Sequence, residues 1–356
     1  MNNTKLSGNI ISKDKAVKKV LFLTPYPYDT APGQRFRYEQ YLGILNQNGI
    51  EYRLCSFMDD DTWEILYKKG FLIKKARGIF AGFIRRLLTL PGVPYCDYVF
   101  IFREASPIGP PVFEWFISKV LRKKIIYDFD DAIWLQNTSD NNQIIAGLKW
   151  HSKVAQICRW SYKVSCGNPY LADYARQFNK NVVINPTTID TVNYHNHIKD
   201  QQTPFLTIGW TGTHSTIQYL DMIVPILRKL EQQYSFTFIV ISNAPPAFEL
   251  KSLSYIRWSK DTEIDDLLKF NVGLMPLTDD AWARGKCGFK ALQYMSLGIP
   301  ALVSPVGVNT TIVDNGVNGI ICHHADEWEQ AIKSLINDRD LSIRLGKEAR
   351  KKIEDK

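Results

Sequence analysis

The feature that most constrains the fold is the alternation of short apolar runs with helical stretches along all 356 residues. An apolar run at 18–25 is followed by a loop, by a helix expected to end near Asn48, and by a second apolar run at 51–57. Strand, helix and strand in this order form a βαβ unit, and repeated units build a parallel sheet with helices on its faces. Ligands of such sheets bind at the carboxyl ends of the strands. We therefore expect the site residues in the loops that follow the strands.

The same alternation restarts after a polar segment near the middle of the chain. Residues 188–204 show no apolar period, and an apolar run resumes at 207–210. We predict an α/β fold with two Rossmann-like α/β/α domains that face each other across a cleft. The domains are expected at 18–187 and 205–356, with 188–204 as the linker and 1–17 as a disordered lead. At this length, each domain can have a core of its own.

The balance of charge restricts the kind of partner. Lysine and arginine outnumber aspartate and glutamate by 44 to 36, which gives a net charge of +8. Such a charge favours an anionic partner, which can be a nucleotide, a membrane surface or a nucleic acid. We find no zinc-finger spacing, no aromatic RNA-binding motif and no single basic recognition helix. The sequence therefore favours a nucleotide or a membrane surface, and it argues against nucleic acid.

Cysteine usage and apolar runs indicate the compartment. The first 17 residues include no apolar signal region, and no run of 18 apolar residues occurs in the sequence. No two cysteines form a C-x-x-C pair, so we expect buried thiols in a reducing compartment. They are Cys55, Cys96, Cys158, Cys166, Cys287 and Cys322. We predict a cytoplasmic protein without a membrane span, with peripheral attachment to the inner face of the membrane left open.

The strongest candidate site lies where a glycine-rich loop enters a helix. The stretch from Gly285 to Gly307 predicts that loop, a helix at 289–297 and a buried strand at 301–304. Gly298 can adopt the left-handed conformation that ends a helix, and Pro300 blocks any continuation. The first turn of the helix offers backbone N–H groups and a partial positive charge. The junction is therefore suited to a phosphate.

Cations surround this junction. Lys286 and Lys290 bracket the first turn, and Arg284 precedes the loop. Gln293 lies three residues beyond Lys290 on the same helical face, where it can hydrogen-bond a ribose hydroxyl. We predict that these side chains converge on one anion, and the alternative is an ordinary loop with its lysines in solvent.

A second candidate for phosphate binding follows the strand expected at 207–210. Gly212 is flanked by hydroxyl side chains, including that of Thr213, and precedes a helix expected at 216–233. The pattern matches neither a Walker motif nor G-x-G-x-x-G. No expected strand is followed by G-x-G-x-x-G, so a nicotinamide-dependent oxidoreductase is set aside.

The loop after the first strand contains further candidates. Gly33 lies where a ligand can approach the backbone closely, and Arg35 and Arg37 follow it. Cations at a helix N-terminus oppose the helix dipole, so they are not explained by helix stability. The arginines are either ligand-binding residues or the solvated first turn of a helix.

Three carboxylates follow the strand expected at 124–127. Asp128, Asp130 and Asp131 repel one another unless a cation, a sugar or a proton lies between them. One alternative is a D-x-D site for Mg²⁺ on a nucleotide diphosphate, which we discount because the phosphate-binding loops lie elsewhere and supply their own positive charge. The other is that Asp130 or Asp131 caps the next helix.

A histidine pair in the linker is the remaining metal candidate. His195 and His197 form an H-x-H pair, but no third ligand lies nearby in the sequence. We therefore expect both to be surface residues and predict no metal site.

The segment 71–90 has two interpretations. At 100° per residue its apolar side chains fall on one half of a helix and its cations on the other, without any acidic residue. The apolar set is Leu72, Ile73, Ala76, Ile79, Phe80, Phe83, Ile84, Leu87 and Leu88, and the cations are Lys74, Lys75, Arg77, Arg85 and Arg86. Such a helix can lie on an anionic membrane surface, but a helix that covers a sheet also has one apolar face.

Six motifs together resemble one protein family. They are APGQRFR, YDFDDAIW and NPTTID in the first half, and GWTGTHSTIQYL, KCGFKALQYMSLGIPALVSPVG and IVDNGVNG in the second. They are similar to motifs of the family 4 glycosyltransferases with the GT-B fold, especially those of bacterial surface-polysaccharide synthesis. The resemblance runs from about Lys18 to the end of the sequence.

The resemblance implies retaining transfer of a sugar from a nucleotide diphosphate sugar to a glycan or lipid-linked acceptor, without a metal ion. The two glutamates of the family's E-x7-E motif fall on Gly285 and Gln293, and its frequent active-site histidine falls on Asp128. The site residues that it implies are Asp128, Asp131 and Lys290 for catalysis; Gly33, Gly212, Thr213, Arg284, Lys286, Gly288, Phe289, Lys290 and Gln293 for the donor; and Arg35, Arg37 and Asp130 on the acceptor side. Because both glutamates are absent, the alternative is a non-catalytic nucleotide-sugar-binding subunit.

Overall fold

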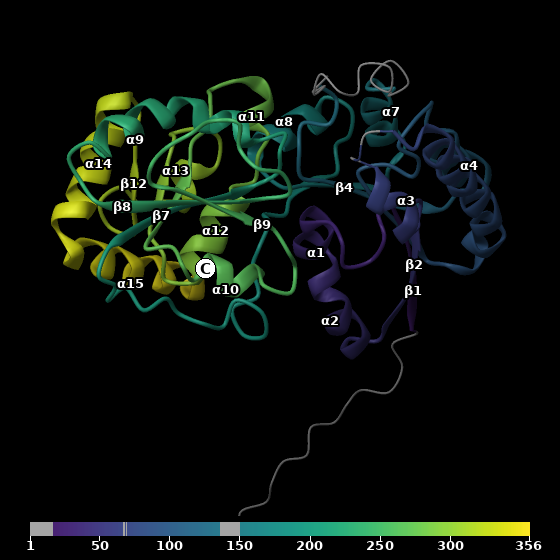
Figure 1. Ribbon diagram of the computed structural model, residues 1–356. Helices are drawn as coiled ribbons and strands as arrows, with labels where there is room; N and C mark the ends of the chain where they lie inside the picture. Colours follow the sequence, from purple (N-terminus) through teal and green to yellow (C-terminus); the bar gives the residue numbers. More distant parts are fainter. Residues whose placement is uncertain (1–16, 67, 69, 136–149) are drawn as a thin grey trace, which may run out of the picture. The chain divides into compact units, whose positions relative to one another are not determined.

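The computed structural model describes residues 17–66, 68, 70–135 and 150–356. It contains two parallel sheets of six strands each, and helices alternate with the strands along the chain (Figure 1). The chain packs as two compact units. We call them unit 1, which comprises the residues up to Pro107, 111–127 and 160–162, and unit 2, which comprises 108–110, 128–159 and 163–356. Of the lead expected at 1–17, residues 1–16 lie outside the described residues.

The first sheet has the strand order β2-β1-β3-β4-β5-β6. Its strands are β1 (Lys18–Thr24), β2 (Ile50–Ser56), β3 (Tyr98–Phe102), β4 (Lys124–Phe129), β5 (Lys163–Cys166) and β6 (Val182–Ile184). In register, Val20 of β1 lies beside Tyr52 of β2 and Tyr98 of β3. Because β1 has neighbours on both sides, its side chains from Leu21 to Leu23 are almost fully buried. This explains why the strand is a continuous apolar run rather than an alternating one.

One helix associated with this sheet is shorter than predicted. The helices are α1 (Pro32–Arg37), the 3₁₀ helix η1 (Glu39–Tyr41), α2 (Leu42–Gln47), α3 (Asp60–Ile65), α4 (Leu72–Thr89), the 3₁₀ helix η2 (Leu90–Tyr95), α5 (Val112–Trp115), the π-helix η3 (Phe116–Val120), α7 (Lys153–Trp160) and α8 (Pro169–Arg176). The single helix expected to end near Asn48 breaks at Tyr38, whose backbone leaves the helical conformation. The Tyr38 ring stacks on Phe22 of β1 at 5.3 Å. Packing on the sheet therefore overrides the local preference for one helix.

The second sheet has the strand order β12-β11-β10-β7-β8-β9. Its strands are β7 (Leu206–Gly212), β8 (Phe236–Ser242), β9 (Leu253–Arg257), β10 (Val272–Met275), β11 (Ala301–Val303) and β12 (Gly319–Ile321). Gly209 of β7 and Gly273 of β10 lie side by side in register. A Cβ atom on Gly209 would lie 2.0 Å from the Phe270 ring, and one on Gly273 would lie 2.2 Å from the Tyr294 ring. These glycines therefore let two aromatic rings pack directly on the centre of the sheet.

The helices of this half follow the predicted alternation with one clear difference. They are the 3₁₀ helix η5 (Ile217–Met222), α9 (Val224–Leu230), α10 (Glu263–Leu267), α11 (Ala281–Arg284), α12 (Phe289–Ser296), α13 (Asn309–Ile312), α14 (Ala325–Asn337) and α15 (Arg339–Asp355). The helix expected at 216–233 begins instead as η5, and its α-helical part starts at Val224. Pro225 lies in the first turn of α9. Backbone N–H groups there have no acceptor within the helix, so a proline, which has no N–H, loses no hydrogen bond. Proline thus sets the start of the α-helix.

The segment expected to be a linker is tied to the last helix. Arg350 of α15 donates from Nη1 to the carbonyl oxygens of His195, at 2.7 Å, and Ser296, and from Nη2 to the carbonyl of Thr191 at 3.3 Å. His195 is fully buried, so the prediction that it is a surface residue was wrong, whereas His197 is exposed. The sequence pattern gave no sign of this, because the carbonyls that hold the segment belong to every residue type.

Two expectations from the composition can be compared with the fold. Cys158, Cys166 and Cys322 are buried, whereas Cys55, Cys96 and Cys287 are partly exposed. All six are free thiols. Among the described residues, no helix combines the length and apolar character needed to cross a bilayer.

The close packing over β7 gives a test of the fold. Gly209→Ala places a methyl group inside the Phe270 ring, and such overpacking typically costs about 1–3 kcal/mol of unfolding free energy. Gly43→Ala is the matched control, since Gly43 lies in α2 with no atom within 4 Å of its would-be Cβ, and the change should be neutral or stabilise by up to about 1 kcal/mol. Urea denaturation measures both. Equal stability of Gly209→Ala and wild type would contradict this packing.

Candidate functional site

The loop before α12 ends at a glycine with a left-handed backbone. Gly288 precedes the helix with φ of 70°, in the left-handed region that favours glycine. A Cβ atom there would lie 2.1 Å from the Cδ1 atom of Ile312. The helix begins at Phe289, as expected. Its first turn has no intrahelical acceptors for the backbone N–H groups and carries the positive end of the helix dipole.

Tyr294 fixes α12 on the sheet. Its hydroxyl accepts a hydrogen bond from the Thr211 backbone N–H at 3.0 Å and donates to the Leu274 carbonyl at 3.3 Å. The side chain is fully buried, and this burial raises the pKa of its hydroxyl well above the ordinary value. The hydroxyl therefore stays protonated and serves as donor and acceptor at once. These two bonds hold the helix against the ends of β7 and β10.

Lys290 lies one turn before Tyr294, on the sheet side of α12. Its Nζ atom is 5.5 Å from the centre of the Trp210 ring. That ring packs on Gly212, where a Cβ atom would lie 2.4 Å from the Cη2 atom of Trp210. Lys290 is therefore next to the Gly212 turn, and the structure brings together the two phosphate-binding candidates of the sequence.

The positive charge of Lys290 is energetically unfavourable in this environment. Desolvation and the neighbouring Lys286 lower the pKa of Lys290 from 10.5 to about 7, although Asp131 acts in the opposite direction. Burial disfavours the charged form of a lysine, and a like charge nearby adds to that effect. An anion bound here would favour the charged form and raise the pKa of Lys290 again.

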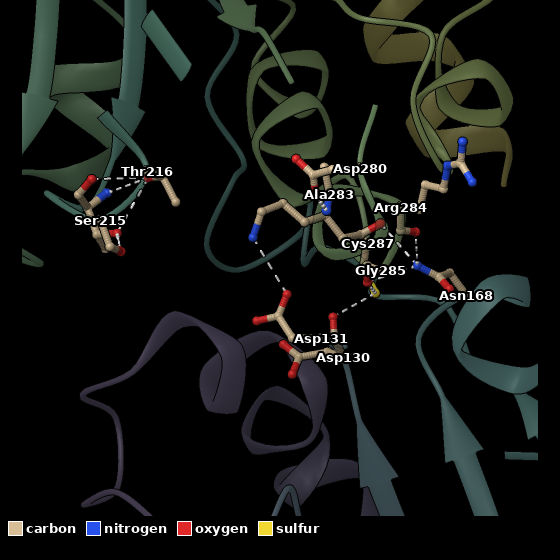
Figure 2. Close-up of polar contacts among 12 residues, drawn as sticks. Asp130, Asp131, Asn168, Ser215, Thr216, Asp280, Ala283, Arg284, Gly285 and Cys287 are labelled. Atoms are coloured by element: carbon tan, nitrogen blue, oxygen red, sulfur yellow. Dashed lines mark hydrogen bonds and ion pairs between the residues drawn. The ribbon is translucent and has the colours of Figure 1, made fainter. Parts of the chain in front are cut away.

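Lys286 lies between an aromatic ring and a carboxylate. Its Nζ atom is 5.4 Å from the centre of the Trp282 ring. The same atom is 3.7 Å from Oδ1 of Asp131, an ion pair drawn as the dashed line to Asp131 in Figure 2. The separation from Asp131 is longer than a charge-assisted hydrogen bond of 2.7–2.9 Å. Lys286 is therefore loosely paired rather than neutralised by a close contact.

The three aspartates at the end of the fourth strand lie in different surroundings. β4 extends to Phe129, two residues farther than predicted, so Asp128 lies inside the strand. Asp128 is buried and accepts a hydrogen bond from the Ser165 hydroxyl at 2.5 Å. The Asp130 carbonyl lies 3.2 Å from Sγ of Cys287, within hydrogen-bonding range of the thiol. The expectation that Asp130 or Asp131 caps the next helix concerns residues 136–149, which lie outside the described residues.

The side-chain amide of Asn168 binds the loop that contains Lys286. Its Oδ1 atom accepts from the Leu171 N–H at 2.9 Å, which caps α8. Its Nδ2 atom lies within 3.0–3.3 Å of the carbonyls of Arg284, Gly285 and Lys286 (Figure 2). The sequence shows Asn168 followed by proline, which is a helix-start signal. It does not show that the same amide organises a loop more than 100 residues later.

Gly285 is also packed closely. A Cβ atom there would lie 2.8 Å from Cβ and 2.9 Å from the backbone nitrogen of Ala132. A glutamate at this position, as in the family that the sequence resembles, would not fit without movement of this backbone. The glycine is therefore required by the packing of the turn that carries Asp131.

Arg284 does not join the two lysines. Its guanidinium donates to both carboxylate oxygens of Asp279, at 2.6 and 3.0 Å. In Figure 2 the side chain points away from the Lys286–Asp131 pair. The prediction that three cations converge is therefore correct for the two lysines only. Arg284 forms an exposed bidentate pair with Asp279 instead.

Gln293 belongs to a buried cluster that sequence reasoning missed. Its Nε2 atom lies 3.4 Å from Oε1 of Glu263. Glu263 also accepts from the Tyr194 hydroxyl at 2.6 Å and from the Trp258 indole N–H at 3.3 Å. Its one local signal is its place in the first turn of α10, which is typical of any acidic residue there.

The hydroxyls around Gly212 bond within their own turn. The Thr213 N–H donates to Oγ1 of Thr216 at 3.1 Å, and the Thr213 hydroxyl lies 2.8 Å from that of Ser215 (Figure 2). The His214 N–H donates to Oδ1 of Asn243 at 2.8 Å. The turn is thus internally ordered.

A cavity of about 440 Å³ lies beside Trp282. It is lined by aromatic, amide, hydroxyl, carboxylate and thioether side chains, namely Gln218, Tyr219, Asp221, Met222, Thr278, Asp280 and Trp282. Trp282 is the residue whose ring faces Lys286. Burial, with Asp280 and Asp131 as further causes, raises the pKa of Tyr219 to about 12. The cavity therefore lies near Asp131 as well, and its lining suits a polar ligand with hydroxyl groups.

The candidates after the first strand lie in unit 1. α1 begins at Pro32, so Gly33 is its second residue rather than part of the preceding loop. Arg35 and Arg37 are buried, which excludes a solvated first turn. Nε of Arg35 is 3.5 Å from Oδ1 of Asp29. Both arginine side chains therefore belong to the packed interior of unit 1.

Comparisons with known proteins bear on this arrangement. Residues 205–338 match the model of a family described as Glycosyl transferases group 1. Three solved structures are similar along most of their length. Sucrose-phosphate synthase from Thermosynechococcus elongatus is 12% identical, with a TM-score of 0.65 and coverage of 95% of this chain and 94% of that one. The fold is of the GT-B type.

The other two structures contain nucleotides. HepE from Anabaena, in complex with UDP and glucose, is 12% identical with a TM-score of 0.61 and covers 95% of each chain. The catalytic domain of starch synthase IV from Arabidopsis thaliana, bound to ADP and acarbose, is 11% identical with a TM-score of 0.66 and covers 94% of this chain and 95% of that one. No curated protein matches the sequence. At these identities the likeness concerns the fold, and it confirms two Rossmann-like α/β domains.

The lowered pKa of Lys290 gives a test that needs no ligand. Below pH 7 the ammonium is charged in both the folded and the unfolded states, so its desolvation cost is fully present, and the cost declines as the pH rises from 7 towards 10.5. Lys290→Met should therefore raise Tm, and more at pH 6 than at pH 9.5. Lys351→Met, at an exposed position, should leave Tm unchanged. A lower Tm of Lys290→Met at both pH values would contradict the assignment.

Proposed function

We propose that the protein is a glycosyltransferase of the family 4 type, which moves a sugar from a nucleotide diphosphate sugar to a glycan or lipid-linked acceptor with retention and without a metal ion. The observation that carries the proposal is the pair Lys286 and Lys290 at the start of α12, beside the Gly212 turn and the cavity. The match of 205–338 to a glycosyltransferase family supports it. So do the UDP and ADP in structures of the same fold.

The two lysines suit the leaving group of such a reaction. When the bond between sugar and diphosphate breaks, negative charge develops on the diphosphate, and fixed positive groups stabilise that charge. Lys286, Lys290 and the N–H groups of α12 supply positive charge without a metal ion. Because the pKa of Lys290 is about 7, this residue is partly neutral when the site is empty, and the arriving dianion draws the proton onto it. Its charge is thus strongest when the ligand is present.

The cavity suits the sugar. Trp282 and Tyr219 offer apolar ring surface, and Asp280, Gln218 and Thr278 offer hydrogen-bonding groups. We assign Asp131 to the orientation of an acceptor hydroxyl, because it is the carboxylate that faces Lys286. Asp128, bonded to Ser165, holds the strand end from which Asp131 projects.

A second function has an observation in its favour. Gly285 and Gln293 stand where the resembled family has glutamates, and Gly285 is packed against Ala132. A non-catalytic subunit that binds a nucleotide sugar within a polysaccharide-synthesis complex would need the lysines but not the glutamates. Sugar transfer, or slow hydrolysis of the donor, by the purified protein would exclude this alternative.

Nucleotide binding is the first expected outcome. In thermal-shift titrations with UDP, GDP, ADP, CMP and dTDP, we expect one nucleoside diphosphate to raise Tm whether or not a chelator is present. At 100 times its Kd a ligand stabilises by about 2.7 kcal/mol, which is roughly 5–10 °C for units of this size. Lys286→Ala should abolish the shift, and Lys351→Ala should keep it. If no nucleoside diphosphate shifts Tm, the proposed site is wrong.

The pH dependence tests the role of Lys290. Between pH 7 and 9 the free site loses its Lys290 proton, so the Kd of the nucleoside diphosphate should rise by up to about tenfold per pH unit. Lys290→Arg, whose guanidinium stays charged, should flatten this rise. Lys290→Ala should lower transfer by roughly 10²-fold or more, as does removal of one donor from an oxyanion hole. A Kd that rises equally in wild type and Lys290→Arg would assign the titration to another group.

A further inference from the structure

Helix α4 packs on unit 1 mainly with a face of small and polar residues, and Phe83 at the border of its apolar face packs on the rings of Phe57 and Phe113. Its buried residues are Gly78, Gly82, Arg86 and Thr89. The sequence allowed the apolar face either to cover the sheet or to lie on a membrane, and in the structure most of that face is exposed on this helix, labelled α4 in Figure 1. The helix buries small and polar residues and exposes apolar ones, the reverse of an ordinary surface helix.

Close contacts fix this orientation. A Cβ atom on Gly78 would lie 2.2 Å from Oγ1 of Thr62, and one on Gly82 would lie 2.4 Å from the Phe57 ring. Arg86 is almost fully buried and donates to three backbone carbonyls, those of Ala105 at 2.6 Å, Cys55 at 2.7 Å and Thr24 at 2.6 Å. Rotation of α4 would drive side chains into Thr62 and Phe57 and would leave the buried guanidinium without acceptors. The apolar face therefore cannot turn inward.

The apolar face forms a continuous exposed stripe. At 100° per residue six large members of this face fall within one sector of the helix and are open to solvent, whereas Ile79 and Phe83 are half-buried. The six are Leu72 (79% exposed), Ile73 (86%), Phe80 (68%), Ile84 (39%), Leu87 (53%) and Leu88 (74%). Contiguous apolar patches on a protein surface mark sites of contact with another molecule or a membrane.

Positive charge accompanies the stripe. At the same helical spacing Lys74, Arg77 and Arg85 follow one edge, and the helix contains no acidic residue. Arg85 pairs with Asp59 at 3.0 Å, so Lys74 and Arg77 are the cations at this edge that carry the charge outward. A second copy packed through the same face would bring like charges together, which disfavours self-association through α4. An anionic lipid surface complements both the charge and the apolar stripe.

We propose that α4 anchors the protein to the surface of an anionic membrane. The 18-residue helix is about 27 Å long and would lie in the plane of the interface, with the stripe among the upper acyl chains and Lys74 and Arg77 against the phosphates of the headgroups. The helix is in unit 1, and the lysine site is in unit 2, so this anchor is independent of nucleotide binding.

Vesicle sedimentation tests the anchor. The protein should co-sediment with phosphatidylcholine vesicles that contain 30% phosphatidylglycerol, and only weakly with pure phosphatidylcholine or at 1 M salt, where the Debye length falls to about 3 Å. Each cation near an anionic surface contributes about fivefold to partitioning, so Lys74→Gln with Arg77→Gln should lower it about 30-fold. Phe80→Ser with Leu88→Ser should abolish it.

Matched variants elsewhere separate the anchor from general effects. Arg344→Gln with Lys347→Gln removes two exposed cations from α15, and Val192→Ser with Ile198→Ser removes two exposed apolar side chains. Both should partition as wild type does, and all variants should unfold at the wild-type urea midpoint because the changed side chains are exposed. The proposal is overturned if wild type does not bind anionic vesicles, or if Phe80→Ser with Leu88→Ser binds them equally. It is also overturned if light scattering shows a wild-type dimer that this variant converts to a monomer.

Discussion

The positive charge of Lys286 and Lys290 is the constraint around which the site in unit 2 is built. Two lysines on the same helical junction repel each other, and burial adds to the cost of charging Lys290. The surroundings offset this with the faces of Trp210 and Trp282 rather than with close carboxylates. Asp131 remains 3.7 Å from Lys286. The charge is thus tolerated by the fold but not neutralised, which leaves it available to a ligand.

The site also depends on backbone groups that are fixed before any ligand arrives. Tyr294 holds α12 to β7 and β10, and Asn168 holds the loop before α12 through its carbonyls. Gly288 and Gly285 allow the loop to pass close to Ile312 and Ala132. A site of this kind needs little reorganisation when charge develops on a leaving group, and such preorganisation is the main source of electrostatic catalysis. The aromatic and amide residues around the lysines therefore contribute as much to the site as the lysines do.

The sequence predicted the local elements of this site but not their partners. The strand at 301–304, the start of α12 and the glycine before it follow from turn and helix-end signals that lie within a few residues. The contacts from Asn168 to Gly285, from Cys287 to Asp130 and from Gln293 to Glu263 join residues far apart in the chain. Local patterns contain no information on such pairs. The period of α4 likewise defined its apolar face but not the direction of that face, which depends on the fit of Gly78 and Gly82 to unit 1.

A comparison of Arg86 with Lys290 distinguishes a structural cation from a functional one. Desolvation lowers the pKa of Arg86 to about 10, so it remains charged at neutral pH, and three carbonyls accept its hydrogen bonds. For Lys290 the pKa falls to about 7, and within the described part of the chain no carbonyl or carboxylate is hydrogen-bonded to its ammonium group. Lys290 is only partly buried, but a desolvated charge without hydrogen bonds still destabilises a fold, whereas Arg86 has its hydrogen bonds satisfied. A fold with an unsatisfied charge of the Lys290 kind is stabilised when an anion supplies the missing hydrogen-bond partner. The apolar stripe on α4 is a similar case. Unit 1 buries Gly78 and Gly82 of this helix and leaves the apolar side chains exposed, so contact with another surface would stabilise them.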